Sequence, residues 1–170
     1  MSSASNEGIP LAAAIDEGVR QGYLTSYLRG SMLDRPFGGK NTHDNTPAIV
    51  HTRIVRGDRV TIHVLPKGGG ADNASRMAMF TPAQGLSAIH DFVMDTIEKA
   101  GPGACPPLIV GIGIGASFDS VGTLAKRALL RDIGEGHHDS DVSRWERDWL
   151  ADINRLGIGP QGYGGISRPY

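Results

Sequence analysis

The single cysteine of this 170-residue chain stands in an unusual setting for a buried thiol. Cys105 is followed by Pro106 and Pro107 and then by the apolar run LIVGIGIG, which is typical of a buried strand. Free cysteines are commonly buried as small hydrophobic residues. Here the thiol precedes the strand, and the two prolines stiffen the backbone that carries it. These residues leave three roles open: a core residue, a nucleophile, or one ligand of a metal site.

A glycine cluster, KGGGADN at residues 67–73, follows the second predicted strand. Consecutive glycines such as Gly69 and Gly70 can turn successive backbone N–H groups toward one point, which makes a nest for a carboxylate or a phosphate. Lys67 would add a positive charge to such a nest. The pattern therefore predicts an anion site, with a flexible loop as the alternative.

Two further groups of residues are candidates for binding. Arg29, at the end of the first predicted helix, has the fork geometry that grips a carboxylate, although an arginine in this place is more often a solvated charge. His137 and His138 lie near Glu135 and Asp139, which suggests a metal. Adjacent imidazoles in a loop point apart, so a solvated turn is the favoured interpretation.

The run GIGIGA, residues 111–116, is similar to the G-x-G-x-x-A fingerprint of dinucleotide-binding proteins. That fingerprint needs a second parallel strand after the helix, ending in an acidic residue. Here the helix runs into the charged loop RDIGEGHHD, so a nucleotide site is disfavoured. The glycines are better explained by close packing of a neighbouring element.

The periodicity of apolar residues predicts helices over 9–28, 82–100, 121–130 and 143–157, the last with Trp145 and Trp149 in the core. The β-branched segments 47–55 and 59–66, joined by Arg56-Gly57-Asp58, predict an antiparallel hairpin. With a strand over 108–114, the expected fold class is mixed α/β (α+β): a central sheet with an antiparallel hairpin, covered by helices. We expect residues 1–170 to form a single domain with a glycine-rich tail over 159–170.

The composition narrows the class of protein. Seventeen basic and eighteen acidic residues give a formal charge of −1, which argues against nucleic acid as a partner. No apolar stretch approaches the roughly 20 residues that a bilayer crossing needs, so no membrane partner is expected. The first ten residues lack the pattern of a secretory signal, and one cysteine forms no internal disulfide. We therefore expect a cytoplasmic protein.

Taken in order, several motifs resemble those of the iron–sulfur hydro-lyases, namely class I fumarase and L-tartrate dehydratase, in their alpha subunit or N-terminal catalytic domain. The matching segments are AIDEGVRQGY, YLRGSMLDRP, NTHDNTPA, KGGGADN, GACPPLIVGIGIG, LAKRALLR and INRLGIGPQGYGG. They run from about Leu11 to Gly165 in the order and spacing of that family. The CPP and GIGIG form is more similar to the fumarase branch.

The resemblance implies a [4Fe–4S] cluster held by three cysteines, with one iron open to act as a Lewis acid on the substrate. Cys105 matches the middle of the three ligands. Arg29 matches an arginine that pairs with a substrate carboxylate, and Gly70 matches a position whose backbone contacts the substrate. Lys67 and Gly69, which precede it in the KGGGADN segment, are predicted to bind substrate with it.

The resemblance also covers the polar segment NTHDNT, which corresponds to an N-T-G-D-N-T motif of the family. Asn41, Thr42, Asp44 and Asn45 are therefore predicted to shape the substrate site. His43 replaces the usual glycine, which puts the backbone conformation of this segment in question.

The implied activity is a carbon–oxygen lyase that reversibly hydrates fumarate to malate, or dehydrates a related hydroxy-dicarboxylate. The implied partners are the small dicarboxylate and a beta subunit or C-terminal domain of the same enzyme, with a homodimer left open. The family's first cysteine, in C-Q-D-T-G with a catalytic aspartate, lies upstream of the matching segments, and its third lies downstream. We thus identify no catalytic residue in this chain and expect two further cysteines from outside it.

We therefore expect the central part of an alpha subunit, truncated at both ends and inactive alone. The alternative is a catalytically inactive remnant that acts only as a folded or partner-binding domain.

Overall fold

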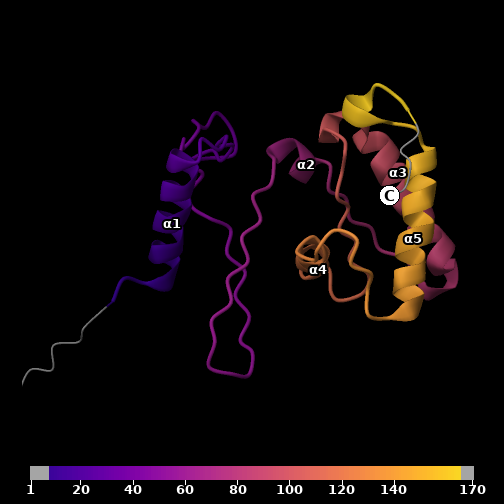
Figure 1. The fold of residues 1–170 in the computed structure, drawn as a ribbon, viewed down its shortest axis with the longest axis horizontal. Helices are drawn as coiled ribbons and strands as arrows, with labels where there is room; N and C mark the ends of the chain where they lie inside the picture. The colour runs from indigo at the N-terminus through magenta and orange to yellow at the C-terminus, as the bar shows by residue number, and fades with distance from the viewer. Residues whose placement is uncertain (1–7, 166–170) are drawn as a thin grey trace, which may run out of the picture. The chain divides into compact units, whose positions relative to one another are not determined.

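The computed structural model describes residues 8–165 (Figure 1). Within them, helices alternate with loops and extended segments. The α-helices are α1 Leu11–Thr25, α2 Gly69–Asn73, α3 Gly85–Ala100, α4 Val121–Ala128 and α5 Ser140–Arg155, and the 3-10 helices are η1 Pro82–Gln84, η2 Gly101–Ala104 and η3 Pro160–Gly162. The chain forms two compact units, one ending at Val60 and the other beginning at Thr61.

The prediction of a central sheet with an antiparallel hairpin is wrong. Figure 1 draws no strand over residues 8–165, where the one β-type pairing is an isolated antiparallel bridge between Leu33 and Asn41. Residues 47–66 and 108–114 are extended, but extended backbone becomes a strand only when a neighbour accepts and donates its hydrogen bonds. Ile54 and Val60 are 95% and 85% exposed, so no sheet face of the predicted hairpin is buried.

The predicted helices are confirmed, because a helix satisfies its own backbone without a distant partner. α5 shows how local chemistry sets both ends. The Asp139 carboxylate accepts hydrogen bonds from the backbone N–H groups of Val142 and Asp141, which lowers the pKa of Asp139. At the other end Gly157 takes a φ of +65°, the left-handed conformation of a helix stop that glycine adopts without strain.

The core of the second unit lies between α3 and α5, which run side by side (Figure 1). Val93, Ile97 and Trp149 are buried there. Partly buried residues that pack against them are Leu86, Ile89, Met94, Ile112, Trp145, Ile153 and Ile158. The predicted core role of the tryptophan pair is thus confirmed.

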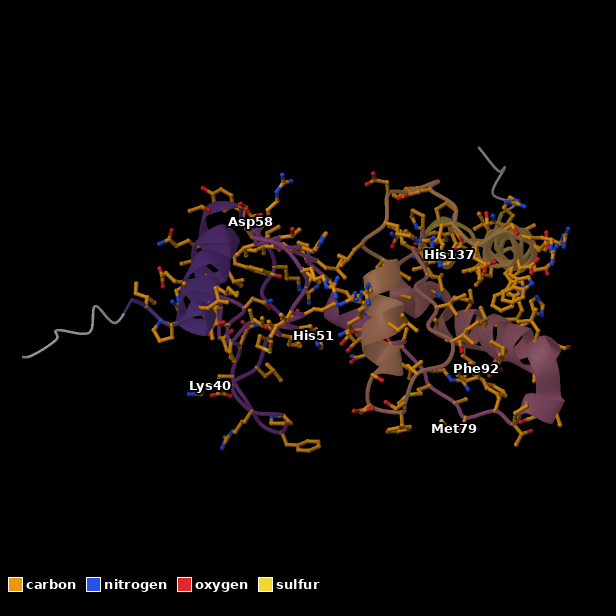
Figure 2. All side chains as sticks on the ribbon, turned by 90° about the horizontal axis from the view of Figure 1, so that it is seen from below. Lys40, His51, Asp58, Met79, Phe92 and His137 are labelled. Atoms are coloured by element: carbon orange, nitrogen blue, oxygen red, sulfur yellow. The ribbon has the colours of Figure 1, made fainter. Side chains whose placement is uncertain are left out.

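The segment before α3 is held to that helix by aromatic contacts. Phe80 packs edge-on against Phe92 with ring centroids 5.7 Å apart; Figure 2 labels Phe92. The guanidinium carbon of Arg76 lies 4.9 Å from the centroid of the Phe92 ring, and Arg76 also donates to Asp95. These contacts hold residues 76–80 against α3.

The glycines of the GIGIG run allow the chain to approach α4 closely, as expected from the sequence. A Cβ on Gly113 would lie 2.6 Å from the Val121 carbonyl oxygen and 2.9 Å from the Ala125 nitrogen. A Cβ on Gly111 would overlap the Ala125 carbonyl and the Leu129 side chain. Packing against a helix backbone, rather than nucleotide binding, therefore accounts for both glycines.

The tail predicted over 159–170 lies partly outside the described residues. Its described part begins with η3 and continues to Gly165. Among the described residues, no helix combines the length and the apolar character that crossing a membrane requires.

Candidate functional site

Cys105 directly follows η2 and occupies a turn on the surface of the second unit. Its backbone is left-handed, with φ 58° and ψ 63°, and its N–H donates to the Pro102 carbonyl over 3.0 Å. The residue is exposed. Cys105 is therefore not part of the core formed by the described residues.

Helix α2, which contains the predicted substrate-binding glycines, packs against the same turn. A Cβ placed on Gly70 would lie 3.3 Å from the Gly103 carbonyl oxygen. Gly69 and Gly70 belong to a short helix in which the Asp72 N–H donates to the Gly68 carbonyl. The glycine run is therefore an ordered helical turn beside the Cys105 turn, not a flexible loop.

Residues 159–164 also pack against the Cys105 turn. The Gln161 N–H donates to the Pro106 carbonyl over 3.1 Å. Gly162, with a φ of +76°, lies so close to Pro102 that a Cβ would overlap the proline ring. Sequence reasoning treated this segment as tail, and the only sign of its role was the matching motif GPQGYGG.

The charge of Lys67 is paired within its own segment. Its Nζ lies 2.8 Å from Oδ1 of Asp72, and this hydrogen bond is the main cause of a lowered pKa at Asp72. Nζ of Lys126, on α4, lies 3.5 Å from the same oxygen. Asp72 therefore ties α2 to α4, a role for Asp72 and Lys126 that sequence reasoning missed.

In the first unit, Arg29 is an exposed residue shortly after α1. The chain that follows it is bound by the turn of residues 41–46. Oδ1 of Asn45 accepts the N–H groups of Ser31 and Met32 over 2.9 and 3.1 Å. Nδ2 of Asn41 donates to the Gly30 carbonyl over 2.9 Å. Both predicted substrate-binding amides thus contact the backbone next to Arg29.

The 41–46 turn is in turn tied to α1 through Asp44. The Arg20 Nε donates to Oδ2 of Asp44 over 2.9 Å, and the Thr46 N–H and hydroxyl donate to Oδ1 over 3.1 and 2.9 Å. These bonds, with that of the Thr46 N–H first, lower the pKa of Asp44 to about 2. The contributions of Arg20 and Thr46 were missed, although Arg20 lies in the matching motif AIDEGVRQGY.

The histidine that replaces the family's glycine fits this turn. His43 takes a φ of 64°, a left-handed conformation in which histidine is more common than most residues with a side chain. The replacement therefore leaves the turn formed. Thr42 is half-buried, and its hydroxyl oxygen is buried without a hydrogen-bond partner among residues 8–165.

The described residues do not by themselves complete a metal site. Across 8–165, no group of three or more His, Cys, Asp or Glu side chains is arranged to hold a metal ion. Cys105 offers one sulfur. Nδ1 of His137 accepts the Asp139 N–H over 3.0 Å, so His137 (Figure 2) orders the start of α5. The donors among the described residues therefore do not fit a whole cluster.

The predicted site residues fall into two groups. Cys105, Gly69, Gly70 and Lys67 lie together in the second unit, around the turn after η2. Arg29, Asn41, Thr42 and Asn45 lie together in the first unit. The structure thus describes two halves of the predicted site, each by itself.

Comparison with known proteins gives the same family as these motifs. Residues 2–168 match the family described as fumarate hydratase (Fumerase). A Methanocaldococcus jannaschii protein, provisionally named an L(+)-tartrate dehydratase subunit alpha, is 40% identical over 165 residues, which are 95% of this chain and 58% of that protein.

L(+)-tartrate dehydratase alpha subunits of Escherichia coli and Shigella sonnei are each 32% identical over 160 residues, 92% of this chain and 53% of theirs. The chain thus spans about half the length of the curated relatives it matches. The chain belongs to the fumarate hydratase (Fumerase) family of hydro-lyases.

Proposed function

We propose that this chain is part of an iron–sulfur-dependent hydro-lyase that adds water to the double bond of a small dicarboxylate. The reaction would convert fumarate reversibly to malate, or dehydrate a related hydroxy-dicarboxylate. The observation that carries the proposal is the meeting of separate family motifs at one exposed thiol. Helix α2 and residues 159–164 both pack against the turn that presents Cys105.

In this proposal Cys105 is one ligand of a [4Fe–4S] cluster. Its exposure and its rigid turn suit a thiolate that must reach a metal outside its own segment. When bound, the cluster would supply a Lewis-acidic iron that polarises the substrate hydroxyl. The chain has one cysteine, so the two other thiolates would come from outside these 170 residues.

The chain's own residues would bind and orient the substrate. Arg29 carries a guanidinium that pairs with one carboxylate of the dianion through two parallel hydrogen bonds. Gly70 and Gly69 would bring backbone close to the substrate beside Cys105. Lys67 would contribute positive charge from a position fixed by Asp72. We propose no catalytic acid or base within this chain.

The other half of the enzyme would be a beta subunit or an equivalent C-terminal domain. The names of the relatives, each a subunit alpha, support such a partner. In this proposal residues 1–170 act as one domain of the alpha subunit, and the isolated chain gives little stable cluster and no turnover.

Substitution of the thiol tests this function. The alpha subunit that carries this sequence, complete with its partner, is reconstituted anaerobically with iron and sulfide. We expect cluster absorbance, hydration of fumarate or dehydration of tartrate, and loss of both in Cys105→Ser. Ala78→Ser is the matched control, because it also places a serine side chain at an exposed residue of the same unit.

Retention of the cluster and of turnover in Cys105→Ser would refute the ligand assignment. A complete wild-type complex that binds no cluster and turns over no dicarboxylate would instead support the alternative function, that of a folded domain that only binds a partner. Circular dichroism of each variant separates loss of the ligand from loss of the fold.

A further inference from the structure

The amide side chains of Asn41 and Asn45 are both engaged by backbone groups, and their partners fix which way each amide points. Oδ1 of Asn45 accepts two N–H groups, from Ser31 and Met32. In Asn41, Nδ2 donates to the Gly30 carbonyl and Oδ1 accepts the His43 N–H over 2.7 Å. A backbone N–H only donates and a carbonyl only accepts, so neither orientation is ambiguous.

The two amides bond to the backbone of Gly30, Ser31 and Met32, which directly follow Arg29 in the chain. Two backbone contacts add to these bonds: the Thr42 N–H donates to the Met32 carbonyl over 2.9 Å, and Leu33 forms an antiparallel bridge with Asn41. The backbone from Gly30 to Leu33 is therefore fastened to the 41–46 turn at successive residues.

This fastening matters because Arg29 itself has a long, flexible and exposed side chain. Rotamer freedom costs affinity when such a side chain must be ordered on a ligand. The position from which the guanidinium reaches out is set by the backbone of residue 29. That backbone is set by the residues immediately after it.

We propose that Asn45 and Asn41 are positioning residues for Arg29, which hold its backbone through Gly30, Ser31 and Met32 instead of touching the substrate. This inference rests on the proposed role of Arg29 in binding a substrate carboxylate. In this inference the two amides influence substrate binding through Arg29, and not through a direct contact with the substrate.

The two asparagines use different atoms of their amide groups, so substitution by aspartate is expected to affect them differently. Asn45 uses only its oxygen, so Asn45→Asp keeps an acceptor for both N–H groups. Asn41 uses its nitrogen as well, so Asn41→Asp removes the donor and sets a carboxylate against the Gly30 carbonyl. If the amides touched a dicarboxylate, the added negative charge would weaken binding at both positions.

Amide hydrogen exchange in the 170-residue chain tests the positioning without any activity. We expect Asn45→Ala to speed exchange of the Ser31 and Met32 amides about tenfold, and Asn45→Asp to change it less than about threefold. Asn154→Ala, in the second unit, is the matched control and should leave both amides unchanged. Unchanged exchange at Ser31 and Met32 in Asn45→Ala would overturn the proposal.

Steady-state kinetics of the complete enzyme then tests the link to Arg29. Asn45→Ala and Asn41→Asp should raise KM for the dicarboxylate about tenfold with kcat nearly unchanged, while Asn45→Asp stays near wild type. In an Arg29→Ala background, Asn45→Ala should add less than about twofold, because it acts through the arginine.

Two outcomes of the kinetics contradict the inference. One is an Asn45→Asp enzyme that loses as much affinity as Asn45→Ala while its amide exchange is normal, since this would indicate a substrate contact. The other is a full additional loss in the Arg29→Ala background. A wild-type enzyme without dicarboxylate activity would refute the proposed function alone, and the exchange experiment would still decide whether the asparagines hold residues 30–32.

Discussion

At the scale of single residues, the Asp44 carboxylate organises the 41–46 turn by accepting several hydrogen bonds. It accepts hydrogen bonds from the Thr46 N–H, the Thr46 hydroxyl and the Arg20 guanidinium. Each bond favours the ionised form, which is why its pKa falls to about 2. The Arg20 bond also ties the 41–46 turn to α1, whereas the two Thr46 bonds lie within the turn.

Because the folded-state pKa of Asp44 is lowered, this residue stabilises the fold above the ordinary aspartate pKa of about 3.9, and the contribution is lost as the pH falls through about 2. We predict that denaturant midpoints of the wild type fall more steeply between about pH 4 and pH 2 than those of Asp44→Asn. Asp58→Asn, at an exposed residue, is the control and should keep the wild-type slope. Equal slopes in wild type and Asp44→Asn would contradict the assignment.

Residue chemistry was only partly predictable from the sequence. The motifs singled out Cys105 and Arg29, because a lone thiol beside prolines and an arginine after a helix are visible locally. The partners of Asp44 and Asp72 were not, since Arg20 and Lys126 lie 24 and 54 positions away in the chain. Such pairings depend on the tertiary fold, which local pattern does not specify.

At the scale of elements, the contact between α3 and α5 carries most of the described core. Val93 and Ile97 on α3 face Trp149 on α5. Helix–helix packing of this kind depends on close complementarity, so removal of a buried methyl group lowers the free energy of unfolding. The polar edge of the same contact is marked by Nε2 of His90, which lies 3.1 Å from the Asp152 carboxylate.

Truncation of Ile97 should therefore weaken this pair of helices. We predict that Ile97→Ala lowers the free energy of unfolding by about 2–4 kcal/mol, and that Ile97→Val costs about 1 kcal/mol. Denaturation followed by tryptophan fluorescence measures both, because Trp145 and Trp149 are the only tryptophans and both belong to this core. A cost below about 0.5 kcal/mol for Ile97→Ala would mean that the contact is not a core.

The elements also show where pattern reasoning succeeds and where it fails. Helices such as α5 were predicted from a periodic apolar face and local end signals, Asp139 and Gly157. The strands were not formed, because alternation in a segment such as 59–66 shows suitability for a sheet and says nothing about whether a neighbour is present. Ile54 and Val60 remain exposed for that reason.

At the scale of the molecule, each unit exposes much apolar surface. Ile49, Ile54 and Val55 in the first unit and Ile62, Val64 and Ile109 in the second are each more than 60% exposed. Soluble monomers rarely leave contiguous apolar patches uncovered. The apolar residues of segment 47–66 are therefore suited to burial against another chain or another part of a longer protein.

We predict that the isolated 170-residue chain self-associates with rising concentration and binds a hydrophobic dye such as anilinonaphthalene sulfonate. Replacing Ile49, Ile54 and Ile62 together by threonine should reduce both signals, while Thr52→Ser, a control in the same segment, should not. Sedimentation velocity and dye fluorescence measure these effects. A chain that remains monomeric and binds no dye would show that this surface is covered in solution.

The packing of Gly162 on Pro102 also has a consequence for the order of biosynthesis. The ribosome makes Cys105 and its two prolines before residues 159–164. The Pro106 carbonyl therefore accepts its hydrogen bond from the Gln161 N–H only after Gln161 has been added to the chain. Until then the thiol turn lacks one of the two segments that pack against it. The nascent chain therefore completes the surroundings of its only cysteine only after residues 159–164 have been made.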